Sequence, residues 1–359
     1  MRTARYPPSL RRQCRKNYTE PVSAPGLLRS QHIAISPKSS RAALANIIRL
    51  AASCILLYVL WRSLETPADV SGVLQGLDLT AFSAAVVIFA LGQVGTALRM
   101  RCLMATLHRP ITCLEAIRIH FSGLAFGCVL PTGMGGDVAK VVMLRHAGGT
   151  LRSVRAVLSG RVVGLLALLL SIVLTAPAIP RVFPRPALML TLVAGSGIAL
   201  AATYFFAAAT RSRWRAMPRW LALLRLLLVD LRRMQRRPQF LAIVLLSMAI
   251  VASVIVTFSL LSKSVGADIP ASFHLLAVPP IILAMHVPLS YGGWGIRESA
   301  AAAVFATAGL DAGTGFILSA LYGITIVVVA IPSVLLWLAG IRRGLTTPGA
   351  PPVEAKTDP

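Results

Sequence analysis

The chain has 359 residues, of which 56% are hydrophobic and 13% charged, and its mean hydropathy is +0.74. Soluble proteins are about 45–50% apolar and about 25% charged, so this composition excludes an ordinary soluble domain. The net charge of +24 accompanies apolar runs too long for soluble cores, which indicates membrane topology rather than nucleic-acid binding.

The two ends of the chain have the composition of disordered tails. Residues 1–41 carry nine Lys and Arg residues against the single acid Glu20, and they lack the apolar centre of a secretory signal. We interpret 1–41 as a basic N-terminal tail, with a transit peptide or an over-long gene start as alternatives. Residues 343–359 are predicted to form a disordered C-terminal tail, which leaves 42–342 as the transmembrane domain.

Six stretches between the tails are long enough to cross a bilayer, which needs about 20 mainly apolar residues. They are 43–61, 79–99, 154–177, 187–208, 239–262 and 313–339.

Two further apolar regions are too short to cross alone. Each ends at a proline, continues through a Gly-Gly loop and meets a second short helical segment. We interpret the regions 115–148 and 272–308 as broken, re-entrant helix pairs. The predicted fold is therefore an all-α polytopic membrane protein with about six full transmembrane helices and two broken pairs, and eight spans are the alternative.

Basic residues in short loops set the orientation of a membrane protein. The loop after the first span is acidic, whereas the loops after the second and fourth spans are rich in arginine. This pattern predicts that both termini are cytoplasmic, in the cell inner membrane. The segment 211–237 also places leucines at helical spacing among nine arginines, which predicts an amphipathic helix on an anionic lipid surface; a solvated linker helix is the alternative.

The two broken regions share the pattern Pro-x3-Gly-Gly followed by a cation. Pro131, Gly135-Gly136 and Lys140 in the first correspond to Pro288, Gly292-Gly293 and Arg297 in the second. Three full spans separate the regions, so the two pairs would enter the membrane from opposite faces. Interrupted helices at matching positions of an inverted repeat are typical of a transporter's binding site.

The broken helices also predict what would bind there. Proline ends the first half-helix, and the glycines allow a tight turn that leaves N–H groups unsatisfied at the start of the next half-helix. These groups and the positive end of the helix dipole attract an anion, for which a phosphate head group is the natural candidate. The alternative is that Pro-Gly-Gly only kinks packed helices.

Ionisable residues next to both glycine loops strengthen this hypothesis, because a charge at the bilayer centre costs about 2.5–3.5 kcal/mol. We expect them to pair with one another or to line a polar cavity, with snorkelling to the interface as the alternative. Arg161 in particular is predicted to contact the anion or Asp137, whereas Arg99 is predicted to anchor the inner end of its span. The candidate substrate-binding residues are Gly135, Gly136, Asp137, Lys140, Arg161, Ser290, Gly292, Gly293, Arg297 and Glu298, with Pro131 and Pro288 as helix breakers.

The sequence shows no pattern of a metal or cofactor site. Five cysteines occur without Cys-x-x-Cys or zinc-type spacing, so we expect free thiols, no metal and no cofactor.

Three motifs resemble the lysylphosphatidylglycerol synthase transmembrane region, a flippase-like family. They are 129–140, 157–165 around Arg161, and 288–298, which is similar to the family signature Pro-x-Ser-x-x-Gly-x-Gly-x-Arg-Glu. Two positions depart from the family pattern: Lys140 stands where arginine is usual, and Gly160 where an acid is frequent. Loss of arginine matters for a bidentate phosphate contact but not for a point charge.

The resemblance implies translocation of a polar, phosphate-bearing lipid between leaflets, and not catalysis. The lipid would be a phospholipid, an isoprenoid phosphate or a hopanoid-type molecule. Two-part relatives carry a soluble lysyl-transferase domain, but only about 17 residues follow Arg342, so we expect no lysyl transfer. The alternatives are a scaffold or accessory subunit for a separate lipid-modifying enzyme, docked through 211–237, and a membrane-embedded lipid-phosphate enzyme using Asp137 and Glu298 as acid and base.

Overall fold

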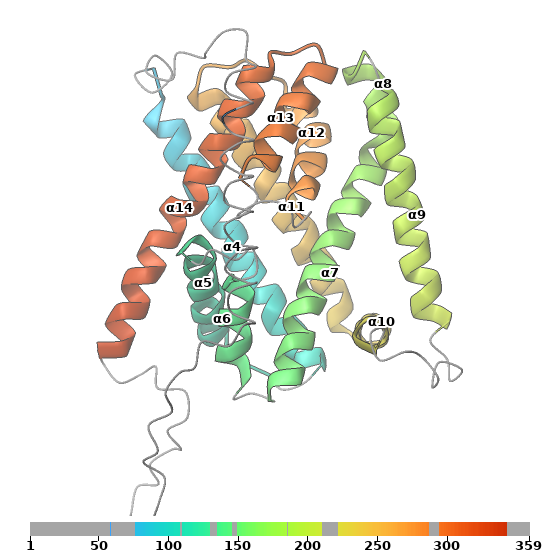
Figure 1. Cartoon of the computed structure of the whole chain (residues 1–359), viewed down its shortest axis with the longest axis vertical. Helices are drawn as coiled ribbons and strands as arrows, with labels where there is room; N and C mark the ends of the chain where they lie inside the picture. Colours follow the sequence, from blue (N-terminus) through green and yellow to red (C-terminus); the bar gives the residue numbers. More distant parts are fainter. Residues whose placement is uncertain are drawn as a thin grey trace, which may run out of the picture. The chain divides into compact units, whose positions relative to one another are not determined.

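A computed structural model describes residues 58, 76–107, 110–129, 135–145, 149–184, 186–209, 222–286 and 294–342, all within the compact unit Ala45–Pro359. Apart from turns and short links, this described part consists of helices and contains no strand (Figure 1). The helices are α4 Leu79–Leu107, α5 Cys113–Val129, α6 Gly135–Leu144, α7 Thr150–Thr175, η2 Ala176–Ala178, α8 Ile179–Val182, α9 Ala187–Ala209, α10 Ala222–Gln235, α11 Gln239–Ser264, α12 Ala271–Ala284, α13 Ile296–Thr307 and α14 Ala312–Arg342.

Five described helical segments are long and apolar enough to cross a membrane, and they confirm five of the six predicted spans. These segments are Leu79–Thr106, Thr150–Val182, Ala187–Ala207, Gln239–Ser264 and Ala312–Val334. The remaining predicted span, 43–61, lies outside the described residues apart from Tyr58. Large apolar side chains are exposed along the five, as expected where a helix meets lipid: Val87, Leu91, Leu174, Leu190, Ile198, Leu241, Leu245, Ile324 and Ile331. The predicted class, an all-α polytopic membrane protein, is confirmed.

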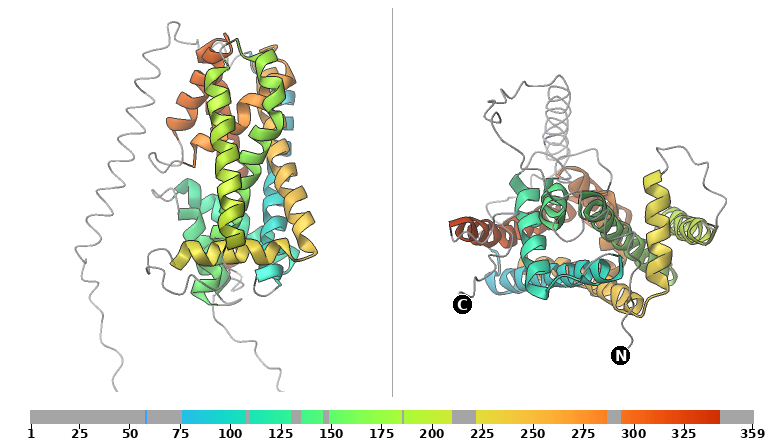
Figure 2. Two further views of the ribbon diagram at one scale, coloured as in Figure 1. Left: turned by 90° about the vertical axis from the view of Figure 1, so that its right-hand side faces the viewer. Right: turned by 90° about the horizontal axis from the view of Figure 1, so that it is seen from below.

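The four short helices fall where the broken pairs are predicted. Helices α5 and α6 lie toward one end of the bundle, and α12 and α13 lie toward the other (Figures 1 and 2). The described helices end at Val129 and Ala284 and resume at Gly135 and Ile296. The turns between them, with Pro131 and Pro288, lie outside the described residues.

Carboxylates cap the starts of two spans. Asp78 accepts a hydrogen bond from the Thr80 N–H at 2.8 Å, and Asp311 accepts bonds from the N–H and hydroxyl of Thr314 at 2.7 and 2.9 Å. Partial burial raises the pKa of the Asp311 carboxyl, but the hydrogen bonds from Thr314 and Gly313 together outweigh it and leave the pKa below its ordinary value. Such caps satisfy the N–H groups that a helix start leaves unpaired.

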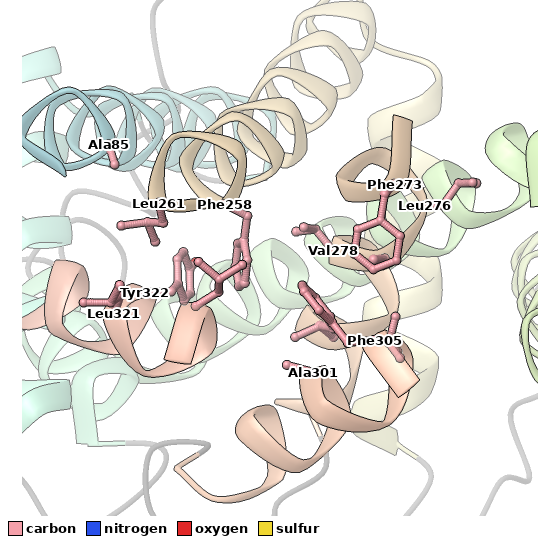
Figure 3. Packing of buried hydrophobic residues seen from close by; sticks show 14 of the residues in the cluster. Ala85, Phe258, Leu261, Phe273, Leu276, Val278, Ala301, Phe305, Leu321 and Tyr322 are labelled. Atoms are coloured by element: carbon pink, nitrogen blue, oxygen red, sulfur yellow. The ribbon is translucent and has the colours of Figure 1, made fainter. Parts of the chain in front are cut away.

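An aromatic core joins α11, α12, α13 and α14 (Figure 3). The rings of Phe258 and Tyr322 lie 4.9 Å apart, and those of Phe273 and Phe305 meet edge to face at 4.8 Å. Aromatic pairs of this geometry stabilise packing beyond the area they bury. This core fixes α13 against α14 and so positions the second candidate region.

Helix α10 confirms a helix within the predicted amphipathic segment and runs crosswise to the spans (Figure 2). Its apolar face is buried through Leu228, Leu231 and Met234. On the same side, fully buried Asp230 accepts a 2.9 Å hydrogen bond from Arg155 of α7 and forms a second contact with its guanidinium. Residues 211–221 lie outside the described part, and contact with a lipid surface stays a prediction.

Candidate functional site

Glycines let α5 and α6 approach closely. A Cβ atom at Gly136 of α6 would collide with the carbonyl oxygen of Gly123 and would lie 3.3 Å from the Cα of Gly127. Both partners are on α5, four residues apart, which is the small-residue spacing that lets membrane helices touch through their backbones. Gly123 also leaves room for the alkyl chain of Lys140. The predicted role of Gly135 and Gly136 in binding stays a prediction, while Gly136 has this packing role.

Asp137 is the centre of an ion cluster on α6 and α7. Lys140, one turn further along α6, places its Nζ 3.7 Å from the carboxylate, and Arg161 of α7 forms an ion pair with the other oxygen. The predicted pairing of Arg161 with Asp137 is therefore confirmed. The side chains of Asp137 and Lys140 are each 18% exposed and that of Arg161 is 44% exposed, so all three remain partly accessible.

Arg99 of α4 adds a third cation that sequence reasoning placed wrongly. It was predicted to anchor the end of its span, but α4 continues to Leu107 and the Arg99 side chain is buried. Its guanidinium donates to the Ser247 hydroxyl of α11 at 3.3 Å and lies against α7, where a Cβ at Gly164 would come within 3.3 Å of it. Among the described residues, no carboxylate lies within 4 Å of Arg99.

Electrostatic interactions join these groups into one site. Lys140 lies close enough to interact with Asp137, Arg161 and Arg99. His120 of α5 interacts with Lys140 and Arg99, and its ring contacts the Gln93 side chain at 3.0 Å. We define Arg99, Lys140 and Arg161 with Asp137 as the cationic cluster. In it, Lys140 and Arg161 share the Asp137 carboxylate, and Arg99 from a third helix lies within electrostatic reach of Lys140.

The second broken region is closed around its own charges. Arg297 and Glu298 are 1% and 0% exposed and are paired with each other. The Nε of Arg297 also donates to the Ser319 hydroxyl of α14 at 2.9 Å, and Glu298 accepts the N–H of Gly295 at 2.6 Å. The Gly295 N–H lies at the helix start that was predicted to offer free donors to a ligand. Because Glu298 accepts it, this donor is satisfied within the protein.

Aromatic rings complete the enclosure of Arg297. Its guanidinium carbon lies 5.1 Å from the Trp294 ring centre and 5.4 Å from that of Tyr322, within the range of cation–π attraction. Gly323 gives these groups room on α14, because a Cβ there would collide with Arg297 and Trp294. The predicted mutual pairing of these charges is confirmed, and contact of Arg297 or Glu298 with a ligand stays a prediction.

A family comparison agrees with this architecture. The family model of the lysylphosphatidylglycerol synthase TM region matches residues 46–333. The chain belongs to this family. Comparison with curated proteins and with solved structures found no match. As a lysylphosphatidylglycerol synthase TM region with several apolar spans, the chain is a multi-pass membrane protein of the flippase-like type.

The rest of the predicted site falls in the glycine loop of the second region. Ser290, Gly292 and Gly293 lie outside the described residues of this family member, as do Pro131 and Pro288. In the part that the structure describes, no group of three or more His, Cys, Asp or Glu residues could hold a metal ion, and Cys102, Cys113 and Cys128 are free thiols.

Proposed function

We propose that the protein moves a phosphate-bearing lipid between the leaflets of the inner membrane and binds the head group at the cationic cluster. The observation that carries this proposal is the pairing of Lys140 and Arg161 with one carboxylate, Asp137, with the buried Arg99 close to Lys140, among helices that include two membrane spans. Membership of a flippase-like family supports it. The proposed reaction contains no covalent step.

The charge of the cluster favours an anionic ligand. Cations are costly inside a membrane unless anions accompany them, and within the described part of the chain no carboxylate lies within 4 Å of Arg99, the buried cation close to Lys140. A phosphodiester would supply a negative charge there. Guanidinium groups match phosphate oxygens through paired donors, and Lys140 would act as a point charge.

The members of the cationic cluster differ in exposure, and we propose that they differ in role. The exposed part of the cluster is provided by the side chains of Asp137, Lys140 and Arg161, whereas Arg99 is buried and donates a hydrogen bond to Ser247. A head group would meet the exposed side chains first, while its hydrocarbon tails remain among the lipids. We further propose that the arginine-rich segment and both termini face the cytoplasm, because basic residues concentrate on that side.

The test is lipid movement by the purified protein in vesicles that contain fluorescent phosphatidylglycerol, followed by reduction of the dye in the outer leaflet. Arg99→Gln and Lys140→Gln should each slow movement at least about tenfold, since a hydrogen bond to a charged group contributes about 1.5–3 kcal/mol. Arg152→Gln is the matched control, because Arg152 is an exposed arginine on α7.

Unchanged rates in both cluster variants would contradict the proposed site. No lipid movement by the wild-type protein, together with stable co-purification of a lipid-modifying enzyme, would favour the scaffold alternative instead.

A further inference from the structure

A pocket of about 190 Å³ lies between α7, α9 and α11, apart from the residues of both broken pairs. Helix α10 forms its roof. The walls are apolar and include Leu166 and Leu170 of α7, Leu200 of α9, Val244 and Met248 of α11, and Met234 of α10.

The pocket lies near one end of the membrane spans. Its three walls are candidate spans, and its roof is the helix that runs crosswise to them (Figure 2). At the same end of α9, Tyr204, Phe205 and Phe206 are exposed. Exposed aromatic rings of this kind are typical of the membrane–water interface. We place the pocket in the hydrocarbon layer directly beneath the lipid head groups.

The chemistry of the walls selects a hydrocarbon occupant. An engineered apolar cavity of about 150 Å³ stays dry and accepts benzene, so this pocket has room for about six or seven carbon atoms of a chain. The Ser247 hydroxyl at its wall donates to the Ile243 carbonyl at 2.7 Å and accepts from Arg99, so it needs no water. At this depth the surrounding medium is acyl chains, and an empty pocket would lose their dispersion contacts.

Cations at the edge of the roof point to the head group of the occupant. Gln235 is exposed and lines the pocket, and exposed Arg236 and Arg237 follow it in the turn to α11. We propose that the pocket binds one acyl chain of an anionic phospholipid whose phosphate lies at Arg236 and Arg237. Ser247 of the pocket wall also accepts a hydrogen bond from Arg99 of the cationic cluster, but the proposal does not rest on the proposed function.

Native mass spectrometry of the full chain tests this site. Delipidated protein is mixed with phosphatidylglycerol or with phosphatidylcholine of the same acyl chains. We expect one phosphatidylglycerol to remain bound at concentrations at which phosphatidylcholine binding is at least about tenfold weaker. The double variant Arg236→Gln with Arg237→Gln should abolish this preference without removing chain binding.

Leu200→Trp fills the pocket and should weaken phosphatidylglycerol binding at least about tenfold. Ile198→Trp is the matched control, because Ile198 is on the same helix but is 70% exposed and does not line the pocket. If Leu200→Trp lowers the melting temperature, Leu170→Phe fills the pocket from α7 instead. Equal binding of the two lipids by the wild-type chain, or equal binding by the filled and control variants, would overturn the proposal, whatever the rate of lipid transport.

Discussion

Replacing Glu298 by glutamine removes one partner of the most deeply buried ion pair among the described residues. Its carboxylate is 0% exposed and compensates Arg297, which is 1% exposed. Breaking a buried pair in this way costs about 3–5 kcal/mol, because the remaining charge is left uncompensated. The rings of Trp294 and Tyr322 still attract the guanidinium by about 0.5–2 kcal/mol. We therefore expect the variant to lose about 3 kcal/mol of folding stability, the lower end of the range for a broken buried pair.

Thermal unfolding of the purified chain in detergent measures this loss. At roughly 2–4 °C per kcal/mol, Glu298→Gln should lower the melting temperature by about 6–12 °C. Asp268→Asn is the control with the same chemistry. Asp268 is exposed and takes part in none of the ion pairs described above, so we expect a cost within about 0.5 kcal/mol.

A double variant separates loss of compensation from loss of packing. Arg297→Leu combined with Glu298→Gln removes both charges, and it should be more stable than Glu298→Gln alone. A melting temperature of Glu298→Gln within about 2 °C of the wild type, or a double variant less stable than the single one, would refute the assigned role of the pair.

Three further outcomes follow from described contacts, each measured by thermal unfolding. Gly136→Leu should cost about 1–3 kcal/mol by forcing α5 and α6 apart, whereas Gly195→Leu, which meets no atom within 4 Å of its Cβ, should not; equal effects would contradict the close approach. Arg155→Asp and Asp230→Arg should each destabilise the chain, and the double charge swap should recover part of the loss; no recovery would exclude direct pairing. Asp311→Ala should cost about 1 kcal/mol at neutral pH. Because the folded-state pKa of Asp311 is lowered, its contribution to folding stability is present above its unfolded pKa of about 3.9 and is lost as the pH falls below that value. A stability difference between the wild type and Asp311→Ala that persists at the lowest pH would contradict this capping role.

Hydropathy predicted the described spans because each one must be apolar over the width of a bilayer. The same windows misjudged where the second span ends. The prediction stopped at 99, where arginines begin, but α4 continues to Leu107. Spacing along one helix cannot show that Arg99 is met by Ser247, a partner 148 residues away on α11. The burial of Arg99 and its hydrogen bond to Ser247 result from helix packing, which the sequence pattern does not show.

Local charge patterns were more informative within the broken pairs. Asp137 and Lys140 are three residues apart on one helix, so their mutual pairing was predictable from spacing. Arg297 and Glu298 are adjacent, a spacing at which helical side chains do not face each other, so spacing does not predict their ion pair. The enclosure of Arg297 was not predictable either, because Ser319 and Tyr322 come from α14. The exposed fraction of each cation therefore had to be taken from the structure, and this fraction decides which cations are accessible to a ligand.

The two regions that share the Pro-Gly-Gly pattern differ in how their cations are used. In the first, Lys140 and Arg161 remain partly exposed around one carboxylate, and the buried Arg99 adds a positive charge close to Lys140. In the second, Arg297 has its own carboxylate, a hydroxyl and two aromatic rings, which together satisfy it. A charge satisfied this fully gains little from a phosphate, because binding would first have to break contacts of equal strength. We therefore infer that head-group affinity resides in the first region, and that the second acts as a rigid frame fixed to the aromatic core.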